Sequence, residues 1–485
     1  MKTPIELDRY SCNWIGGERV QGMAAMEVEN PATGRTIARV PDLEDEAVDR
    51  AIESAGQAFD SWSRLPAGVR AGYLNEWAQR LLDHSEELAS LLTLEQGKPL
   101  VESRGEIAGA AAIIRWYAEE GKRAYGEIIP ASNEGQQLLV YREAAGVVGL
   151  ITPMNFPAAT VARKVAPALA ASFTLVLKPA ETTPLTAIAL FDHLMATGIP
   201  AGAANLVTGE AARIGARLMA HPAIRKISFT GSTRIGKLLM EQAARTVKKV
   251  SLELGGNSPV IVFPDADPEK AAADIAANKF ENCGQVCNGI NRIYVHEDIR
   301  DAFVAALLSR VRRLRTGPGL SEGADVGPLI SGAALAKVER LVGDAVAKGG
   351  ELLAGGRRLQ GEPYADGYFY APTLIAGVTG EMDIAHEEIF GPVAPVLTFR
   401  TEEEVVAAAN DTAYGLATYV YTQNFARIHR MIRVLKTGNI GVNGTSLAYP
   451  QAPFGGVKES GIGREGGRQG LEEYTVLKYV ALTTE

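Results

Sequence analysis

Between residues 146 and 254 the sequence alternates between short apolar runs and longer amphipathic ones. The short runs are rich in Val, Ile and Leu, as buried strands are, and span 146–151, 174–178, 204–208, 226–230 and 250–254. The runs between them have helical length and periodicity and span 158–171, 183–197, 211–220 and 233–245. This pattern predicts a doubly wound α/β domain with a parallel sheet, a fold that binds nucleotides at the carboxyl ends of its strands.

The length of the chain indicates more than one domain, because 485 residues exceed what a single hydrophobic core usually organises. A second alternation runs from 260 to about 438, and we place the boundary between the two near Gly255-Gly256. Periodicity predicts helices before the first strand and in the second domain, at 44–62, 68–94, 101–120, 268–279, 299–314 and 334–348.

Composition argues against several classes of partner. A net charge of -8 and a pI near 5.5 do not suit a broad nucleic-acid surface. The sequence has no uninterrupted apolar run of bilayer-spanning length and no apolar core of a signal peptide at its start. Three cysteines do not make a disulfide framework and suit a reducing compartment. We therefore expect a soluble cytoplasmic protein that binds neither nucleic acid nor membranes.

Two of the three cysteines, Cys283 and Cys287, lie on one Gly-containing connection between a helix-like and a strand-like run. Reactive residues often lie on loops held by rigid elements, so we interpret Cys287 as a nucleophile that attacks a carbonyl carbon. The simpler alternative is a small apolar residue packed in the loop. Cys283 could form a reversible disulfide with Cys287. No metal site is expected here, because no nearby Cys or His completes a ligand set.

Two further side chains stand where strands are expected to end. Glu253 closes the run 250–254, where partial burial would raise its pKa toward that of a general base. Asn155 lies on the turn after 146–151, and its amide could stabilise a developing oxyanion. Each also has a structural alternative: Glu253 as a carboxylate satisfied by amides or an arginine, and Asn155 as an Asx-turn residue.

Polar residues follow two other strands of the first domain. Gly231 and Ser232 form a turn before a helix, where Ser232 suits an N-cap and the first-turn amides suit an anion. The spacing is neither that of a dinucleotide fingerprint nor that of a P-loop, so the pattern alone is weak. Lys178 and Glu181, three residues apart after the run 174–178, could hold ribose hydroxyls or could form a solvated loop pair.

Taken together, these stretches resemble one family, the NAD(P)-dependent aldehyde dehydrogenases. The resemblance covers essentially the whole chain and is carried by seven motifs in order: Pro153-Met-Asn-Phe-Pro157, Lys178-Pro-Ala-Glu181, Phe229-Thr-Gly-Ser232, Leu252-Glu-Leu-Gly-Gly256, Gly284-Gln-Val-Cys287, Glu388-Ile-Phe-Gly-Pro392 and Pro453-Phe-Gly-Gly-Val-Lys458. Two C-terminal stretches look like its succinate-semialdehyde dehydrogenase branch: Phe454-Gly-Gly-Val-Lys-Glu-Ser-Gly-Ile-Gly-Arg464-Glu-Gly and Glu472-Glu-Tyr-Thr-Val-Leu-Lys-Tyr479.

The resemblance implies the role of each catalytic residue. Cys287 would attack the aldehyde to give a thiohemiacetal, whose alkoxide the Asn155 amide and the Cys287 backbone N–H would hold. Hydride transfer to the nicotinamide would leave a thioester, and Glu253 would activate water to hydrolyse it. The presence of Glu253 argues against the CoA-acylating branch, where this base is typically absent.

The resemblance also implies the cofactor site. Gly231 and Ser232 would lie against the pyrophosphate, Lys178 and Glu181 against the adenosine ribose, and Glu388 and Phe390 around the nicotinamide. The remaining residues expected to bind the dinucleotide are Ile151, Thr152, Pro153, Gly215, Ile235 and Leu254. Because Glu181 would repel a 2′-phosphate, we expect NAD in preference to NADP, which stays possible.

The expected architecture follows from the same likeness: a Rossmann-like cofactor domain, a second α/β catalytic domain and a small β oligomerisation arm. The cofactor domain would comprise 1–124 and 146–255, the catalytic domain 256–440 and the arm 125–145 with 470–485. Such enzymes assemble through an interleaved arm, so we expect a homodimer or a homotetramer.

The expected substrate is a small aldehyde, with succinate semialdehyde first. Arg163 matches an arginine with which that branch holds the substrate carboxylate, and Phe454 is expected beside the substrate. Six residues before Cys287, where the branch typically has a second arginine, this chain has Glu281, which leaves lactaldehyde or a related semialdehyde as an alternative. Met154, where tryptophan is common, would alter the wall beside Asn155. The competing classes are a thiol hydrolase without redox chemistry and a non-catalytic binding protein.

Overall fold

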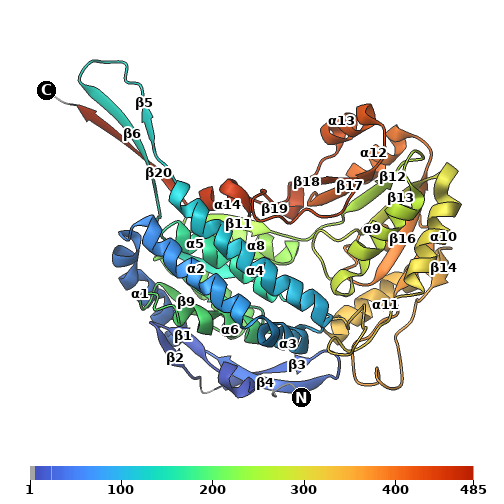
Figure 1. Cartoon of the computed structure of the whole chain (residues 1–485), viewed down its shortest axis with the longest axis horizontal. Helices are drawn as coiled ribbons and strands as arrows, with labels where there is room; N and C mark the ends of the chain where they lie inside the picture. Colours follow the sequence, from blue (N-terminus) through green and yellow to red (C-terminus); the bar gives the residue numbers. More distant parts are fainter. Residues whose placement is uncertain (1–5, 23, 484–485) are drawn as a thin grey trace.

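The chain folds into two α/β lobes, each around its own sheet, and a narrow arm that projects from the first lobe (Figure 1). This computed structural model describes residues 6–22 and 24–483. The predicted fold class is confirmed. The predicted domain limits at residues 1–5 and 484–485 lie outside the described residues, and the other domain limits stay predictions.

The sheet of the first lobe has the order β19-β11-β10-β7-β8-β9-β1-β2. Its five parallel strands agree with the predicted runs to within two or three residues: β7 (Val147–Ile151), β8 (Thr174–Lys178), β9 (Ala204–Leu206), β10 (Ile224–Thr230) and β11 (Lys249–Glu253). The chain winds outward from β7 to β9 and then returns to the other side of β7. Ligands bind in this kind of sheet where the winding direction switches, at the carboxyl ends of the central strands.

The edges of this sheet were not predicted. Two N-terminal strands, β1 (Asn13–Ile15) and β2 (Glu18–Val20), extend it beyond β9, and β19 (Gly461–Ile462) pairs antiparallel with β11. The nearby strands β3 (Ala24–Asn30) and β4 (Arg35–Asp42) form a separate hairpin. The pairing of β19 returns the C-terminal part of the chain to the strand that ends in Glu253.

Helices cover both faces of the first sheet (Figure 1): α1 (Asp45–Ser63), α2 (Ala67–Asp83), α3 (Ser85–Gln96), α4 (Leu100–Glu120), α5 (Pro157–Ala170), α6 (Pro184–Met195), α7 (Ala211–Ala220) and α8 (Thr233–Ala244). The prediction of a single helix over 68–94 was wrong. The chain breaks at His84, whose backbone is not helical, and this break separates α2 from α3. Helical periodicity continues across the break, which is why the pattern concealed it.

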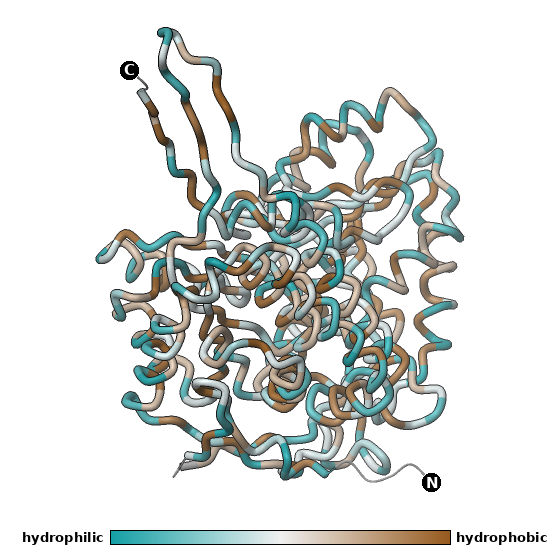
Figure 2. Tube along the Cα trace, turned by 60° about the vertical axis from the view of Figure 1, so that its left-hand side comes forward, coloured by the Kyte–Doolittle hydropathy of each residue, from teal (hydrophilic) through white to brown (hydrophobic). Residues whose placement is uncertain are grey.

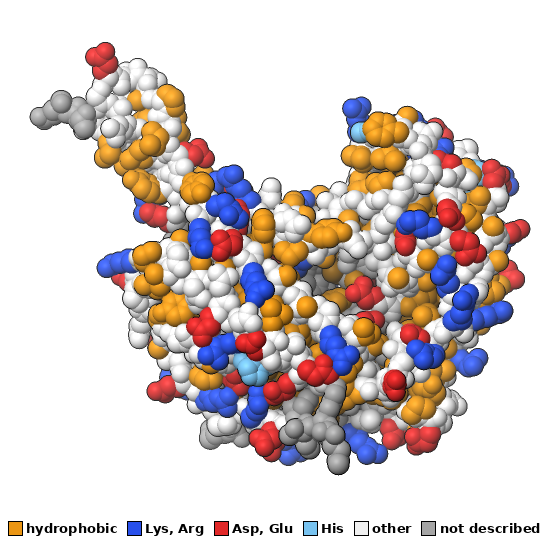
Figure 3. Space-filling model, in the orientation of Figure 1, with side chains coloured by type: hydrophobic (Ala, Val, Ile, Leu, Met, Phe, Trp, Pro, Cys, Tyr) orange, Lys and Arg blue, Asp and Glu red, His pale blue; other side chains and the backbone are white. Residues whose placement is uncertain are grey.

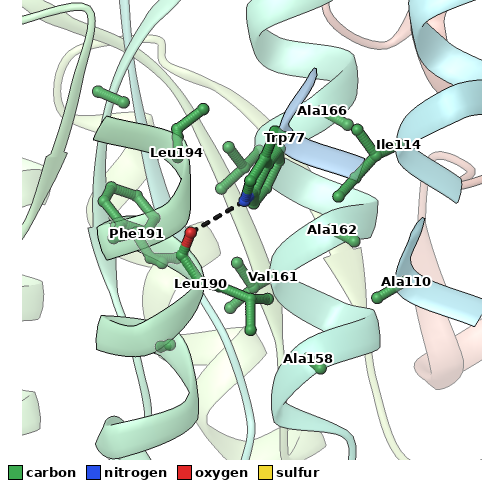
Figure 4. Packing of buried hydrophobic residues seen from close by; sticks show 14 of the residues in the cluster. Trp77, Ala110, Ile114, Ala158, Val161, Ala162, Ala166, Leu190, Phe191 and Leu194 are labelled. Carbon is green, nitrogen blue, oxygen red and sulfur yellow. Dashed lines mark hydrogen bonds between the residues drawn. The ribbon is translucent and has the colours of Figure 1, made fainter. Parts of the chain in front are cut away.

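The helix layer on one face packs tightly around Trp77, which is fully buried. Figure 4 shows its ring between α4, α5 and α6, with a stripe of alanines, Ala158, Ala162 and Ala166, on the facing side of α5. Residues four apart share one face of a helix, and their small side chains let α5 approach its neighbours. The indole nitrogen of Trp77 donates to the carbonyl oxygen of Leu190 at 2.9 Å (Figure 4).

The second lobe is built on a seven-stranded sheet with the order β14-β15-β16-β13-β12-β17-β18. Its strands are parallel except for β14: β12 (Pro259–Val262), β13 (Arg292–His296), β14 (Glu351–Ala354), β15 (Thr373–Ala376), β16 (Val393–Phe399), β17 (Ala417–Tyr421) and β18 (Asn439–Val442). The helices are α9 (Pro268–Phe280), α10 (Arg300–Val311), α11 (Gly332–Ala347), α12 (Glu402–Asn410) and α13 (Phe425–Val434). The three helices predicted here are therefore present.

The arm is a three-stranded antiparallel sheet of β5 (Glu127–Ile129), β6 (Gln136–Glu143) and β20 (Val476–Thr483). The last strand follows α14 (Gly467–Glu472), so the arm joins two segments far apart in the sequence. Hydrophobic residues recur along its strands and appear on its surface (Figures 2 and 3). Those exposed are Tyr125, Ile128, Ile129, Tyr141, Val476, Leu477, Tyr479 and Leu482.

None of the helices within residues 6–22 and 24–483 combines the length and the apolar character needed to cross a membrane.

Candidate active site

One cavity of about 720 Å³ brings the predicted site residues together. It opens at the carboxyl ends of β7, β8, β10 and β11 and reaches the loops of the second lobe that carry Cys287 and Glu388. All fifteen residues predicted as catalytic or cofactor-binding line it: Asn155, Glu253 and Cys287, with Ile151, Thr152, Pro153, Lys178, Glu181, Gly215, Gly231, Ser232, Ile235, Leu254, Glu388 and Phe390. Met154 lines the same cavity.

Cys287 lies on a loop whose backbone is sharply turned. After α9 come three consecutive residues with positive φ, Asn282 (48°), Cys283 (57°) and Gly284 (73°). The first two are not glycines, so tertiary contacts must hold them in this costly conformation. Gln285 provides such contacts: its Nε2 donates to the Asn282 carbonyl at 3.1 Å, and its Oε1 accepts from the Ile330 N–H at 2.9 Å.

The backbone at Gly256 also fits closely against the nucleophile. A Cβ at this position would lie 2.7 Å from the carbonyl oxygen of Cys287, so only glycine lets the end of the first lobe approach the loop. The amide N–H of Gly256 donates to Glu388 Oε1 at 3.0 Å. Gly256 therefore joins the Cys287 loop to the segment that carries Glu388.

The Cys287 thiol is half-buried and lies in a negative environment. Burial, the largest cause, and the negative charges of Glu253 and Glu388 together raise its pKa to about 12. The nearby Arg163 acts in the opposite direction. A thiol of this kind is neutral near pH 7, so it needs a base to become a nucleophile.

Glu253 can supply that base. It ends β11, is 6% exposed, and its Oε2 accepts no hydrogen bond from any described residue. Burial, followed by the charge of Glu465, raises its pKa well above the ordinary carboxyl range. Lys164 lies close by and donates to Glu465 Oε1 at 2.6 Å. A carboxylate that has an unused oxygen and a raised pKa is suited to general-base chemistry at neutral pH.

Asn155 lies between β7 and α5, on the turn where the sequence predicted it. Its Nδ2 donates to the carbonyl oxygen of Gln285, two residues before Cys287, at 2.9 Å. A side-chain amide has two N–H donors, so one remains for an oxygen that develops charge beside the sulfur. The turn is thus bonded directly to the nucleophile loop.

The far part of the cavity has the features of a dinucleotide site. Lys178 and Glu181 form an ion pair of 2.9 Å, and the Glu181 side chain is 39% exposed at the cavity wall. Burial lowers the pKa of Lys178. A Cβ at Gly215 would project into open space, so the glycine on α7 leaves room for a ligand against the helix backbone.

Ser232 occupies the N-cap of α8, as predicted, but its side chain makes no capping hydrogen bond. Its hydroxyl and the first amides of the helix therefore remain available to an anion such as a pyrophosphate. Neighbouring Gly231 is held by its N–H, which donates to the Glu253 carbonyl at 3.0 Å. The residues present thus fit a dinucleotide that extends from Glu181 toward Cys287.

Arg163 and Phe454, two predicted substrate residues, lie together beside this cavity without lining it. The Arg163 guanidinium is 6.0 Å from the centre of the Phe454 ring, and both residues are buried. Nη2 of Arg163 donates to the Ala448 carbonyl at 3.3 Å, whereas Nη1 has no partner among the described residues. A buried cation with an unused donor is an appropriate site for a carboxylate.

The third predicted substrate residue, Glu281, is not brought to the same cavity. It is exposed and lines a second cavity of about 330 Å³, together with Glu102, Arg310 and Arg313. Although the residue as a whole is exposed, the protein around its carboxyl group displaces water and raises its pKa, while Lys98 acts to lower it. Its proposed repulsion of a substrate carboxylate stays a prediction.

Cys283 is buried in the core of the second lobe, where burial strongly raises its pKa. A disulfide switch with Cys287 stays a prediction. Among residues 6–22 and 24–483, no group of three or more His, Cys, Asp or Glu side chains is arranged to hold a metal ion.

The sequence assigned no role to several residues that support the site through hydrogen bonds, among them Lys98, Glu106, Asn282 and Gln285. Glu106 lies in a predicted helix whose pattern indicates only packing, and Lys98 lies in the short connection before that helix. The one available signal was the Gly97-Lys98-Pro99 turn between two helices, where a lysine is not required for the turn itself.

Comparison with known proteins agrees with this geometry. A model of the aldehyde dehydrogenase family matches residues 18–480. The chain is 50% identical over 471 residues to a mitochondrial succinate-semialdehyde dehydrogenase of Arabidopsis thaliana, covering 96% of this chain and 88% of that protein. It is 47% identical over 469 residues to a 3-sulfolactaldehyde dehydrogenase of Pseudomonas putida, covering 97% and 95%.

A solved structure extends this likeness to the whole fold. The succinate-semialdehyde dehydrogenase from Burkholderia pseudomallei superposes with a TM-score of 0.97 at 46% sequence identity, covering 100% of both chains.

Proposed function

The chain belongs to the aldehyde dehydrogenase family, and we propose that it oxidises succinate semialdehyde to succinate with NAD. One observation carries the proposal: a single cavity holds the Cys287 thiol, the unpaired oxygen of Glu253 and the Asn155 amide next to a dinucleotide-shaped region. A nucleophile, a base and an oxyanion donor are the groups that aldehyde oxidation through a covalent thioester requires.

The protein's own groups carry out the first step. Glu253 takes the proton of the Cys287 thiol, and the sulfur attacks the aldehyde carbon, forming a C–S bond and placing a negative charge on the carbonyl oxygen. The free N–H of the Asn155 amide stabilises that oxygen. A nicotinamide held beside Glu388 and Phe390 would supply the acceptor for a hydride from the same carbon, and loss of that hydride would leave a thioester on Cys287.

The second step releases the acid. Glu253, having passed its first proton to solvent, takes a proton from a water molecule as the water oxygen attacks the thioester carbon. The C–S bond breaks, the sulfur leaves as a thiolate, and the product is a carboxylate. Overall, aldehyde, water and NAD⁺ give carboxylate, NADH and two protons.

The chain's residues also support a preference for NAD. Glu181 presents a carboxylate beside Lys178, where the two hydroxyls of an adenosine ribose would lie, and it would repel a 2′-phosphate. Lys178 acts in the opposite direction, since its amine could bind that phosphate. Because Glu181 already accepts the Lys178 ion pair, we propose NAD first and NADP as the alternative.

Arg163 supports a substrate that carries a carboxylate. Its unused Nη1 and its burial favour one anionic group, and its charge lies close enough to lower the pKa of both Cys287 and Glu253. The relatives named above act on a semialdehyde and on a sulfolactaldehyde, both anionic aldehydes by their printed names. Another small aldehyde, such as lactaldehyde or a related semialdehyde, remains the alternative because Glu281 replaces a second arginine.

We further propose a separate function for each domain and for the arm. Residues 1–124 and 146–255 bind the cofactor, and residues 256–440 carry the nucleophile. Residues 125–145 and 470–485 join copies into a homodimer or homotetramer, supported by the exposed apolar side chains of the arm. The three cysteines are free in the structure, which supports a reducing, cytoplasmic location.

The test is to mix the purified protein with NAD and follow reduced nicotinamide while comparing succinate semialdehyde, lactaldehyde and propionaldehyde. We expect the highest kcat/KM with succinate semialdehyde and no turnover by Cys287→Ala. Replacing Arg163 with Gln removes a charge-assisted hydrogen bond to the substrate, so kcat/KM should fall on the order of 10- to 100-fold more for succinate semialdehyde than for propionaldehyde, which loses only the effect of the Arg163 charge on Cys287 and Glu253.

Two outcomes would contradict the proposal. Equal losses for charged and uncharged aldehydes in Arg163→Gln would remove the argument for an anionic substrate. Ester hydrolysis that is independent of NAD, without any aldehyde oxidation, would show a thiol hydrolase instead.

A further inference from the structure

A buried ion pair behind the cavity is bonded to the backbone of Asn155. Lys98, on the connection between α3 and α4, donates from Nζ to Glu106 Oε2 at 2.6 Å, and the two side chains are 0% and 2% exposed. The same Nζ donates to the carbonyl oxygen of Asn155 at 2.8 Å. Neither side chain lines the cavity, and Nζ of Lys98 and both oxygens of Glu106 are bonded to protein groups.

The other oxygen of Glu106 holds the start of α5, which follows Asn155 by two residues. Glu106 Oε1 accepts the N–H groups of Ala158 at 2.8 Å and Ala159 at 3.1 Å. The N-cap residue of this helix, Phe156, provides no side-chain cap of its own. The carboxylate from α4 therefore replaces the missing cap and interacts favourably with the positive end of the helix.

Within the described part of the chain, three hydrogen bonds that involve a side chain join Asn155 to its neighbours, and one of them has a charged donor. The Asn282 amide donates to the Asn155 carbonyl at 2.8 Å, and the Asn155 amide donates to the Gln285 carbonyl at 2.9 Å. Both are bonds between neutral groups. The donor from Lys98 is a charged ammonium group. Its Nζ is excluded from water and lies 3.9 Å from the centre of the Phe156 ring, so this hydrogen bond is the strongest of the three.

We propose that Lys98 and Glu106 are positioning residues that hold the Asn155 amide in the orientation in which it receives the substrate's oxyanion, an inference that rests on the proposed function. Lys98 fixes the carbonyl oxygen of Asn155 and thereby the plane from which its side chain extends. Glu106 fixes both Lys98 and the next turn of the chain. An oxyanion donor is effective only when it is oriented before the charge develops, and a shift of about 1 Å can lower the rate about 100-fold.

The experiment compares Lys98→Met with the double variant Lys98→Met/Glu106→Gln. The single change leaves the Glu106 carboxylate buried without its partner, so both the Tm and kcat should fall. In the double variant the buried charge is gone, the glutamine oxygen still accepts from the start of α5, and methionine still packs on Phe156. The Tm should therefore largely recover, whereas kcat should stay about 100-fold below wild type, because the charged donor no longer reaches the Asn155 carbonyl and only the neutral Asn282 amide still donates to it.

Two further readouts separate positioning from general damage. The KM for NAD should be unchanged, and the rate at which iodoacetamide alkylates Cys287 should be as in wild type, since alkylation creates no oxyanion. Glu95→Gln is the matched control: this fully buried carboxylate caps α6 through the N–H groups of Leu185 and Thr186, at 2.7 Å each, and does not contact Asn155. It should lower the Tm without lowering kcat.

The assignment is overturned if the double variant recovers kcat together with the Tm, since the pair would then be only structural. It is also overturned if alkylation of Cys287 slows in proportion to kcat, because the whole nucleophile loop would have moved. A wild-type protein that oxidises none of the aldehydes would overturn the proposed function instead, and this assignment with it.

Discussion

The charge of Glu253 affects the pKa of Cys287, because both groups lie where water screens charges poorly. Burial is the largest cause of the raised pKa of each group, and the Glu253 carboxylate adds to that of Cys287. The arrangement keeps the thiol protonated until a base removes its proton. It also protects the sulfur from oxidants in the free protein, because the thiolate is the reactive form.

This gives a prediction for pH. Because the pKa of Cys287 is raised to about 12, the fraction of thiolate should rise about tenfold for each pH unit throughout the range from neutral to alkaline. The rate at which iodoacetamide inactivates the cofactor-free protein should increase in the same way and reach no plateau below about pH 10. Cys287→Ala, checked by mass spectrometry, is the control for alkylation elsewhere. A plateau near pH 7 would mean that the thiol is already ionised.

A second residue-scale prediction concerns Glu181. Replacing it with Ser removes the carboxylate that would repel a 2′-phosphate and leaves the Lys178 amine without its ion-pair partner. The ratio of kcat/KM for NADP to that for NAD should therefore rise, on the order of 10-fold or more, as expected for the loss of one close charge repulsion of about 1.4 kcal/mol or more. An unchanged ratio would show that Glu181 does not lie near the adenosine ribose.

At the scale of elements, two helices of the first lobe have their N-termini capped by side chains from other helices. Neither α5 nor α6 has a side-chain cap at its own N-cap residue, and each is capped by a buried glutamate from another part of the helix layer, Glu106 and Glu95. Both α5 and α6 follow strands that end at the cavity. The Glu106 cap fixes the angle at which α5 leaves β7 and so places the turn that carries Asn155, whereas the Glu95 cap stabilises the start of α6.

Trp77 tests the packing of the same layer. Trp77→Ala would remove the ring that fills the space between α4, α5 and α6, and it would leave the Leu190 carbonyl without its indole donor. The free energy of unfolding should fall by about 3–5 kcal/mol, because a cavity replaces the ring. Chemical denaturation with and without NAD would measure it. Trp77→Phe should lower the free energy of unfolding less than Trp77→Ala does, since most of the ring volume remains. Equal decreases in the two variants would contradict this view of the packing.

At the scale of the whole molecule, the cavity depends on both lobes. The first lobe contributes Asn155 and Glu253, whereas Cys287 and Glu388 come from loops of the second. The returning strand β19 pairs with β11, the strand that ends in Glu253, and so ties the C-terminal part of the chain to the site. The arm lies outside this arrangement and exposes apolar side chains that nothing in the described chain covers.

The arm therefore provides the prediction for assembly. Leu477 and Tyr479 lie two residues apart on one face of β20 and are 63% and 60% exposed. The double variant Leu477→Lys/Tyr479→Lys should shift the mass measured by light scattering after size exclusion to that of a smaller species. Leu320→Lys, which changes an exposed leucine outside the arm, is the control and should leave the mass unchanged. An unchanged mass in the arm variant would exclude this face of β20 as an interface.

Much of this protein could be predicted from the sequence, because local patterns report burial directly. Five apolar runs became the five parallel strands of the first sheet, and strand ends placed Glu253 and the turn of Asn155 at one edge. The seven motifs that resemble one family then indicated which of these residues act together. Strand period, strand ends and short motifs are properties of neighbouring residues, so the sequence alone was sufficient for them.

Other features were decided only by contacts between distant parts of the chain. Helical periodicity runs through His84, where the structure separates α2 from α3, and nothing local predicts that β19 returns to β11. Glu281 lines a second cavity, next to a turn of positive φ at Asn282 and Cys283 that no local pattern predicts, and its effect on the substrate stays a prediction. The contact between Glu106 and Ala158 joins residues 52 positions apart. Such pairings depend on how whole helices pack, because tertiary packing sets the distances that no local period contains.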